Sequence, residues 1–162
     1  MIVRVALSTV AIGWVALAAY AARVEPQPLD VHAAQPAASP AAARSVWDGV
    51  YTSEQAQRGE AVYARECARC HGQSLEGNGE GTRPLVGIEF LSTWNGLTLG
   101  DLLDRIRLTM PLETPGKLKR QETADVLAYI VSANKFPAGT SELPRESERL
   151  KEIRFDALRG GR

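Results

Sequence analysis

The five residues Cys67-Ala68-Arg69-Cys70-His71 constrain this chain more than any other feature of its sequence. On a helix, the two thiols lie three residues apart on one face, and the imidazole follows directly after the second thiol. This C-x-x-C-H spacing is the attachment signature of a c-type haem. Both thiols can form thioether bonds to the haem vinyl groups, and the histidine is placed to bind the iron. The motif therefore predicts one covalently attached haem c, with Cys67 and Cys70 as thioether residues and His71 as an axial iron ligand.

Three other uses of this motif fit the rest of the sequence less well. A structural zinc site needs four ligands, and the only histidine besides His71 is His32, which lies in an Ala/Pro-rich segment. A thiol–disulfide exchange motif is expected beside a βαβ pattern, which this sequence lacks. A disulfide between Cys67 and Cys70 would leave His71 without a role. Two cysteines also exclude a disulfide-dense scaffold.

The second axial ligand follows by elimination. The chain has two methionines, and because Met1 belongs to the N-terminal segment, Met110 supplies the one internal thioether. It follows His71 by 39 residues and precedes Pro111, where a turn can direct its sulfur inward. We therefore expect Met110 to be the sixth iron ligand, and a thioether in this position raises the reduction potential. The alternative is that Met110 only fills the core, as methionine often does.

The N-terminal segment predicts export from the cytoplasm. An uncharged run of 18 residues extends from Val5 to Ala22 between two arginines and contains the small-x-small sequence Ala19–Tyr20–Ala21. These are the parts of a signal peptide, although the run is slightly short for a membrane span of roughly 20 residues and slightly long for a cleaved signal. We expect residues 1–23 to be a cleaved signal peptide or an uncleaved transmembrane anchor. The protein is then periplasmic or anchored to the inner membrane, and residues 24–44, rich in Ala and Pro, form an extended linker.

The remaining sequence predicts an all-α domain, because apolar residues recur at helical spacing and no alternating run is long enough for a sheet. Residues 71–95 contain five glycines and a proline, so this stretch is expected to be mostly loop. A charged C-terminal tail, residues 145–162, is expected to carry one short helix over Ser147–Ile153. The three main helices are expected over Ser53–Ala68, Thr98–Thr109 and Arg120–Asn134.

Capping residues mark the first two of these helices. Thr52 with Gln55, and Thr98 with Asp101, each form the sequence pattern of a capping box. The third helix begins after Lys119, where a capping residue would be usual, so its first turn is expected to fray. Its polar face is expected to carry Glu122, Asp125 and Ser132.

Several short motifs of the chain together resemble those of class I monohaem c-type cytochromes. They are C-A-R-C-H, R-P-L-V-G, L-T-M-P and D-V-L-A-Y-I. The outer segments S-V-W-D-G-V-Y-T, F-L-S-T-W-N-G-L-T and F-P-A-G are similar to exported bacterial cytochromes associated with periplasmic dehydrogenases. The resemblance implies a class I cytochrome c fold, with three main helices around the covalently bound haem, and a cytochrome c domain over residues 45–144.

The resemblance also implies roles for five further residues. Pro84 matches the proline whose carbonyl accepts the Nδ1–H of the haem histidine and so orients that ring. Trp94 resembles a tryptophan near a haem propionate, and the alternative is an ordinary core aromatic. Gly59, Tyr63 and Tyr129 match the crossing of the first and last helices, where the glycine permits close backbone approach.

These features together predict a one-electron carrier that is not an enzyme. Iron with both axial positions filled by protein has no open site for a substrate, and no serine–histidine pair or paired catalytic carboxylates are identifiable. Equal numbers of basic and acidic residues, 19 of each, argue against nucleic-acid binding. The expected partners are redox proteins: a periplasmic dehydrogenase, an oxidase or a bc1-type complex. Two alternatives stay open, namely a haem enzyme in which Met110 dissociates to admit a small ligand such as peroxide, and a haem subunit of a membrane-bound dehydrogenase or oxidase complex.

Overall fold

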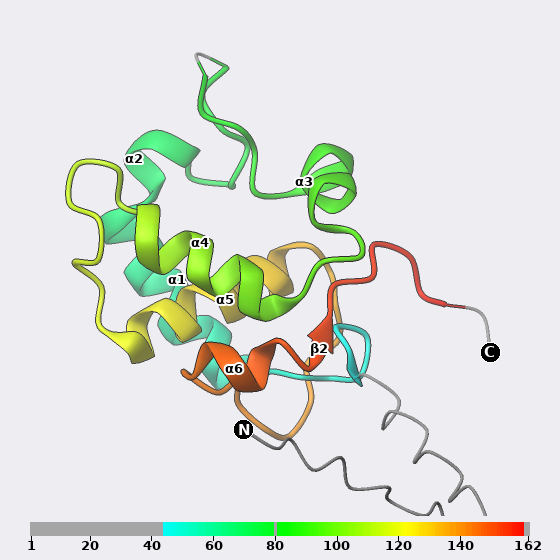
Figure 1. Ribbon diagram of the computed structural model, residues 1–162. Helices are drawn as coiled ribbons and strands as arrows, with labels where there is room; N and C mark the ends of the chain where they lie inside the picture. The colour runs from blue at the N-terminus through cyan, green and yellow to red at the C-terminus, as the bar shows by residue number, and fades with distance from the viewer. Residues whose placement is uncertain (1–43, 80, 161–162) are drawn as a thin grey trace, which may run out of the picture. The chain divides into compact units, whose positions relative to one another are not determined.

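The computed structural model describes residues 44–79 and 81–160 (Figure 1). The expected signal or anchor segment and nearly all of the expected linker lie outside these residues. Within the described part of the chain, no helix combines the length and the apolar character that crossing a membrane requires. In chain order the elements are β1 (Arg44–Ser45), α1 (Ser53–Glu66), α2 (Ala68–His71), α3 (Gly87–Trp94), α4 (Leu99–Thr109), α5 (Arg120–Ala133), α6 (Ser147–Leu150) and β2 (Ile153–Arg154).

The predicted all-α fold with three main helices is confirmed, and these helices are α1, α4 and α5. The first helix ends earlier than expected, because Cys67 leaves the helical conformation with φ −121° and ψ −37°. A separate short helix, α2, follows from Ala68. The two-residue strands β1 and β2 form a parallel pair that the sequence did not predict.

Helix α3 lies in a stretch that was expected to be mostly loop; most of that stretch is loop, but this helix within it was not predicted. Gly87 opens the helix with φ 81°, a conformation that favours glycine. Phe90 is the one fully buried side chain of the helix, and its ring lies 5.9 Å from that of Phe155 between centroids. An isolated helix of this length is unstable in water, so tertiary packing around Phe90 stabilises it.

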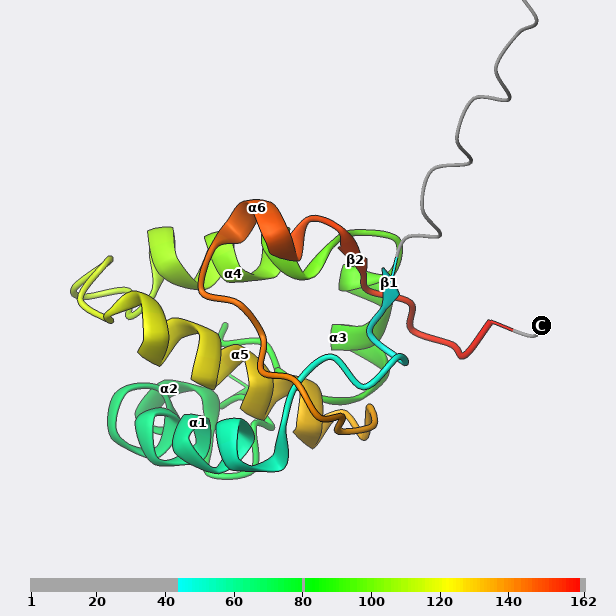
Figure 2. The same ribbon diagram turned by 90° about the horizontal axis from the view of Figure 1, so that it is seen from below.

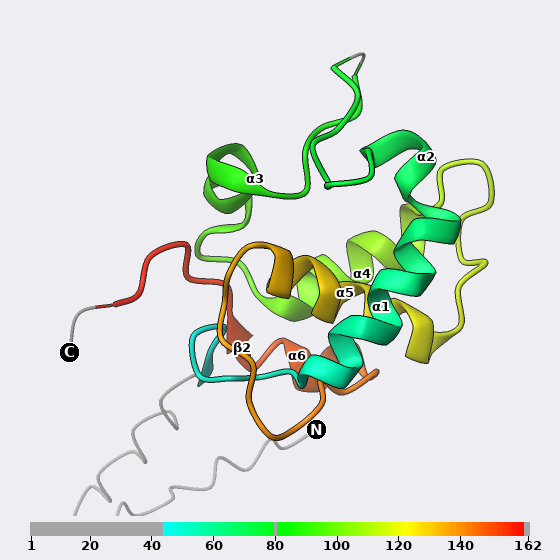
Figure 3. The same ribbon diagram turned by 180° about the vertical axis from the view of Figure 1, so that it is seen from behind.

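The crossing of α1 and α5 forms the centre of the packing (Figures 2 and 3). A Cβ atom placed on Gly59 would lie 1.8 Å from the carbonyl oxygen of Asp125, so only glycine allows the two backbones to approach this closely. Beside this point the rings of Tyr63 and Tyr129 lie 5.3 Å apart between centroids. Gly59, Tyr63 and Tyr129 thus lie at the helix crossing, as the resemblance implied.

Asp125 was expected on the exposed polar face of α5, and this prediction is wrong, because the residue is buried and only 4% exposed. Helix α1 covers this side of α5, and Arg58 from α1 donates two hydrogen bonds to the carboxylate, at 3.2 and 3.1 Å. Gln121 donates a third at 2.9 Å. A buried carboxylate is tolerated when it is paired and hydrogen-bonded in this way.

Helix caps show a second difference between expectation and structure. The capping box at Thr98 is formed: its Oγ1 accepts from the Asp101 amide at 3.1 Å, and Asp101 accepts from the Thr98 amide at 2.9 Å. At the start of α5, where fraying was expected, the Glu122 carboxylate accepts from the Lys119 amide at 3.0 Å. This hydrogen bond supplies the cap that the residue type at position 119 does not.

The Thr52 cap is only half of the expected box. Thr52 Oγ1 accepts from the Gln55 amide at 3.1 Å, but the Gln55 side chain is fully buried and bonds elsewhere. It donates to the Leu143 carbonyl at 3.1 Å and accepts from the Leu143 amide at 2.7 Å. Gln55 therefore fixes the chain that follows α5 against α1.

The C-terminal segment packs along α4 and α3. Helix α6 lies against α4 at Gly100, where a Cβ atom would meet backbone atoms of Ser147 and Lys151 at 2.8 Å (Figure 2). Beyond β2, the Phe155 amide donates to the Leu97 carbonyl at 2.8 Å, and the Gly96 amide donates to the Phe155 carbonyl at 2.9 Å. The boundaries proposed from the sequence for the cytochrome domain and the tail stay predictions.

Candidate haem site

The attachment motif lies in a sharp turn between α1 and the loop that follows α2. The Cys67 amide donates to the Tyr63 carbonyl at 2.8 Å, which completes the last turn of α1 before the chain bends. Gly72, with φ 81°, ends α2 and donates to the Ala68 carbonyl at 2.9 Å. This geometry gathers both cysteines and His71 within one turn of chain.

All six site residues predicted from the sequence line one cavity of about 710 Å³. This volume is typical of a ligand pocket. Most of the wall is apolar, and it is contributed by α1, α3, α4, α5 and the loop before α3. The lining includes Tyr63, Cys67, Cys70, His71, Pro84, Leu85, Phe90, Trp94, Leu102, Ile106, Met110, Val126 and Ile130.

His71 is oriented by a backbone carbonyl, but that carbonyl belongs to Arg83. The distance from His71 Nδ1 to Arg83 O is 3.2 Å, whereas the resemblance implied the carbonyl of Pro84. Pro84 lines the cavity, and its assignment as the carbonyl partner of His71 is corrected to Arg83.

Met110 reaches the same cavity from the end of α4. It is the C-cap residue of that helix, with extended backbone angles (φ −123°, ψ 150°), and its amide donates to the Ile106 carbonyl at 2.9 Å. Its side chain is partly buried and packs against the core. The structure thus places the internal methionine and the C-x-x-C-H motif around one cavity, and the ligand role of Met110 stays a prediction.

The environment of Cys67 does not favour thiolate chemistry. Burial raises the pKa of its thiol to about 11, and the neighbouring Glu66 charge acts in the same direction. Cys67 and Cys70 are not joined to each other by a disulfide, and within residues 44–79 and 81–160 no three His, Cys, Asp or Glu side chains gather as a metal site.

Sequence reasoning missed part of the cavity wall. For the last helix the polar face was predicted, and Val126 and Ile130, which are four residues apart and line the cavity together, were not identified. They form a second apolar stripe, which is what a helix buried on two sides requires. Tyr63 was expected only at the helix crossing. Its hydroxyl also donates to the Gly72 carbonyl at 2.7 Å, and burial raises its pKa well above the usual range.

These residues fit a covalently held haem. Two thiols and an imidazole lie in one turn, a thioether lies on the same cavity, and the wall between them is apolar. Charged groups, Arg83, Glu89 and Arg105 among them, also contribute to the lining, and the first two are more than half exposed. The arrangement therefore offers covalent attachment, two candidate axial ligands and a dry environment for a flat apolar ring.

The fold and the site define a monohaem c-type cytochrome, whose cofactor is covalently bound haem c with its iron and whose chemistry is haem-based electron transfer. The family model described as "Cytochrome C oxidase, cbb3-type, subunit III" matches residues 54–130, from α1 into α5, which is a little under half of the chain. This range contains the C-x-x-C-H motif and Met110.

Among solved structures, the chain is similar to the sulfane dehydrogenase SoxCD from Paracoccus pantotrophus, with a TM-score of 0.44 and 18% sequence identity. The similarity covers 67% of this chain and 61% of that one, so the chain spans less than two thirds of the SoxCD chain. No curated protein sequence shows a significant match.

Proposed function

We propose that this chain is an exported one-electron carrier whose haem iron is held between His71 and Met110. The single observation that supports this best is the position of Met110. The one internal methionine of the chain lines the same cavity as the C-x-x-C-H motif. Ligation requires this position, because it places the thioether and the His71 imidazole on the same cavity.

When bound, haem c supplies a one-electron ferric/ferrous couple. Cys67 and Cys70 hold the ring through thioether bonds. The carbonyl of Arg83 accepts the Nδ1–H of His71, which leaves Nε2 free to bind metal and makes the imidazole more basic. The Met110 thioether favours the reduced state and so raises the potential.

The cavity wall keeps this ligand set unchanged between oxidation states. Leu102 and Ile106 from α4, with Val126 and Ile130 from α5, line the space between the ligands with apolar side chains. Covalent attachment and rigid helices hold the same ligands in both states, which keeps reorganisation small. Since His71 and Met110 would both be engaged as iron ligands and leave no site for a substrate, we propose that the chain transforms no substrate of its own.

We propose redox proteins as its partners, a periplasmic dehydrogenase, an oxidase or a bc1-type complex, and the periplasm as its location. The support for export is the N-terminal sequence, which lies outside the described residues. With zero net charge, docking would depend on local patches and not on long-range steering. Co-purification from membranes together with an intact N-terminus would instead favour a haem subunit tethered to a larger complex.

The test is an anaerobic redox titration with visible spectra on protein expressed with export. The wild-type ferric protein should show the far-red methionine–iron band and titrate as a single one-electron centre. Met110→Ala should abolish this band and lower the potential, because the thioether that favours ferrous iron is lost. An unchanged spectrum of the variant would refute ligation by Met110, and carbon monoxide binding by the native reduced protein would favour an enzyme.

A further inference from the structure

The stretch that follows Met110 leaves the cavity after two residues, since Pro111 and Leu112 line the cavity and the residues after them in this stretch do not. Residues 112–117 are all exposed, and Leu118 is the first buried side chain after Met110. The amides of Thr114 and Lys117 donate to carbonyls within this stretch, so these hydrogen bonds close local turns only. A segment with so few buried contacts opens at low free energy unless other contacts hold it.

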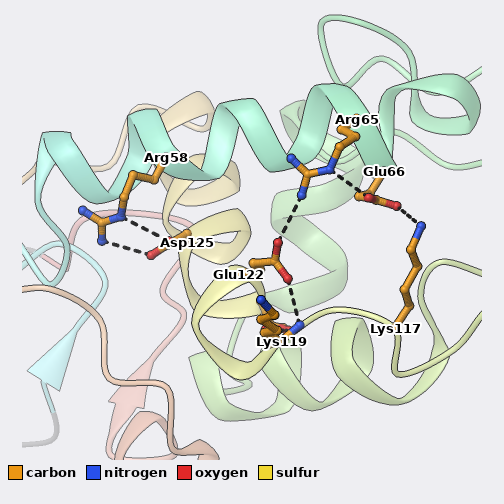
Figure 4. Close-up of polar contacts among 8 residues, drawn as sticks. Arg58, Arg65, Glu66, Lys117, Lys119, Glu122 and Asp125 are labelled. Carbon is orange, nitrogen blue, oxygen red and sulfur yellow. Dashed lines mark hydrogen bonds and ion pairs between the residues drawn. The ribbon is translucent and has the colours of Figure 1, made fainter.

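Glu66 supplies such a contact from the last turn of α1 (Figure 4). Its Oε2 accepts from Lys117 Nζ at 2.8 Å, and its Oε1 accepts from Arg65 Nε at 2.9 Å. The Glu66 side chain is only 12% exposed. Hydrogen bonds from Lys117, which has the larger effect, and from Arg65 lower its pKa. This ion pair is therefore less screened by water than an ordinary surface pair.

The polar contacts continue from Arg65 to the start of α5 (Figure 4). Arg65 Nη2 donates to Glu122 Oε1 at 3.1 Å, and Glu122 Oε2 accepts from the Lys119 amide at 3.0 Å. The end of α1 thus holds Lys117 directly, and it is joined to the Lys119 backbone through Glu122 of α5.

We propose that Glu66, Arg65 and Lys117 are positioning residues that keep the Met110 thioether at its place on the cavity wall. Glu66 is bonded directly to Cys67, which lines the cavity, and only six residues separate Lys117 from Met110. The ion pair therefore limits the motion of the methionine-bearing segment relative to the attachment turn. This inference rests on the proposed ligation by Met110.

A second ion pair joins the same two segments and offers a built-in comparison. Arg69, inside the attachment motif, pairs with Glu113, and each side chain is 73% exposed. Exposed pairs of this kind contribute little, because water screens the charges and two long side chains lose freedom. The positioning effect is therefore assigned to Glu66 and not to Glu113.

The experiment measures the apparent Kd with which imidazole replaces Met110 in the ferric holoprotein. Loss of the far-red band reports the replacement. Glu66→Gln and Lys117→Met should each lower the apparent Kd for imidazole by about threefold. The double variant should stay within about twofold of Glu66→Gln, because either change breaks the same pair. The matched control is Glu148→Gln, which removes a carboxylate in α6 that pairs with Lys151, the residue after that helix. This variant should bind imidazole like the wild type.

Amide hydrogen exchange of the holoprotein gives a readout that does not depend on the ligand band. Amides of residues 110–119 should exchange faster in Glu66→Gln and Lys117→Met than in Glu148→Gln or the wild type. Wild-type imidazole affinity and wild-type exchange in both variants would overturn the inference while leaving the carrier function intact. A wild-type ferric protein without the far-red band would refute ligation by Met110 itself, and the inference with it.

Discussion

At the scale of single residues, Gly59 shows how one side-chain hydrogen sets the distance between two helices. Alanine is the better helix former by about 1 kcal/mol, so helix propensity alone predicts that Gly59→Ala stabilises the protein. The new Cβ atom would however lie 1.8 Å from the Asp125 carbonyl oxygen, and backbone does not yield as a flexible side chain does. We expect the steric cost to win and the unfolding free energy to fall by about 1–3 kcal/mol.

Urea unfolding of the holoprotein measures this difference. Glu60→Ala, a substitution at an exposed position of the same helix, serves as the control and should change stability by less than about 0.5 kcal/mol. A Gly59→Ala protein as stable as the wild type would mean that α1 and α5 can separate without loss.

Asp125 and Arg83 show where residue types mislead. A carboxylate at helical spacing with other polar residues predicts an exposed face, yet Arg58 on another helix neutralises Asp125 and permits its burial. The sequence contains Arg58, but not the information that these two helices cross there. The carbonyl facing His71 belongs to Arg83 because of the local direction of the chain, which no residue type encodes.

At the scale of elements, the main helices could be predicted because each carries a local signal. Thr98 with Asp101 marks the start of α4, and a proline follows its end. Helix α3 has no such signal: it depends on Phe90 packing against Phe155, 65 residues away in the sequence. The candidate site was more predictable than the fold around it, because attachment chemistry fixes the spacing of Cys67, Cys70 and His71 along the chain.

The contact between α6 and α4 gives a prediction about pH. Ser147 donates to Asp104 at 2.7 Å, and this hydrogen bond, with Arg107 also contributing, lowers the pKa of Asp104. A carboxyl group whose pKa is depressed by folding adds stability above its unfolded pKa of about 3.9, and that stability is lost as the pH falls through the folded-state pKa. Ser147→Ala should therefore lower the unfolding free energy by about 1 kcal/mol at neutral pH.

The difference between Ser147→Ala and the wild type should shrink as the pH falls below the unfolded-state pKa of about 3.9 and Asp104 becomes protonated. Urea unfolding at a series of pH values measures it. Ser141→Ala, at an exposed position in the loop after α5, is the control. A difference between Ser147→Ala and wild type that stays constant from neutral to acid pH would show that the hydroxyl acts without the charge of Asp104.

At the scale of the whole molecule, the C-terminal segment joins parts of the chain that are far apart in sequence. Asp156 accepts from the Ser45 hydroxyl at 2.6 Å and, through its carbonyl, from the Trp47 indole at 2.9 Å. Its neighbour Phe155 bonds to the turn between α3 and α4 through its backbone. The start of the described chain and the helix that carries Trp94 are thereby held by the same short segment.

Phe155→Ala tests whether this segment unfolds together with the haem-binding helices. Phe155 is fully buried, and its ring lies 5.9 Å from Phe90 and 5.3 Å from Phe136 between centroids. Emptying such a site costs about 3–5 kcal/mol of unfolding free energy, whereas Leu158→Ala, at a residue 83% exposed, should cost almost nothing. Because Phe90 lines the cavity, amides of α3 should also exchange faster in Phe155→Ala. If urea unfolding and exchange of the variant match the wild type, the segment is not part of the cooperative unit, and that unit ends near Pro144.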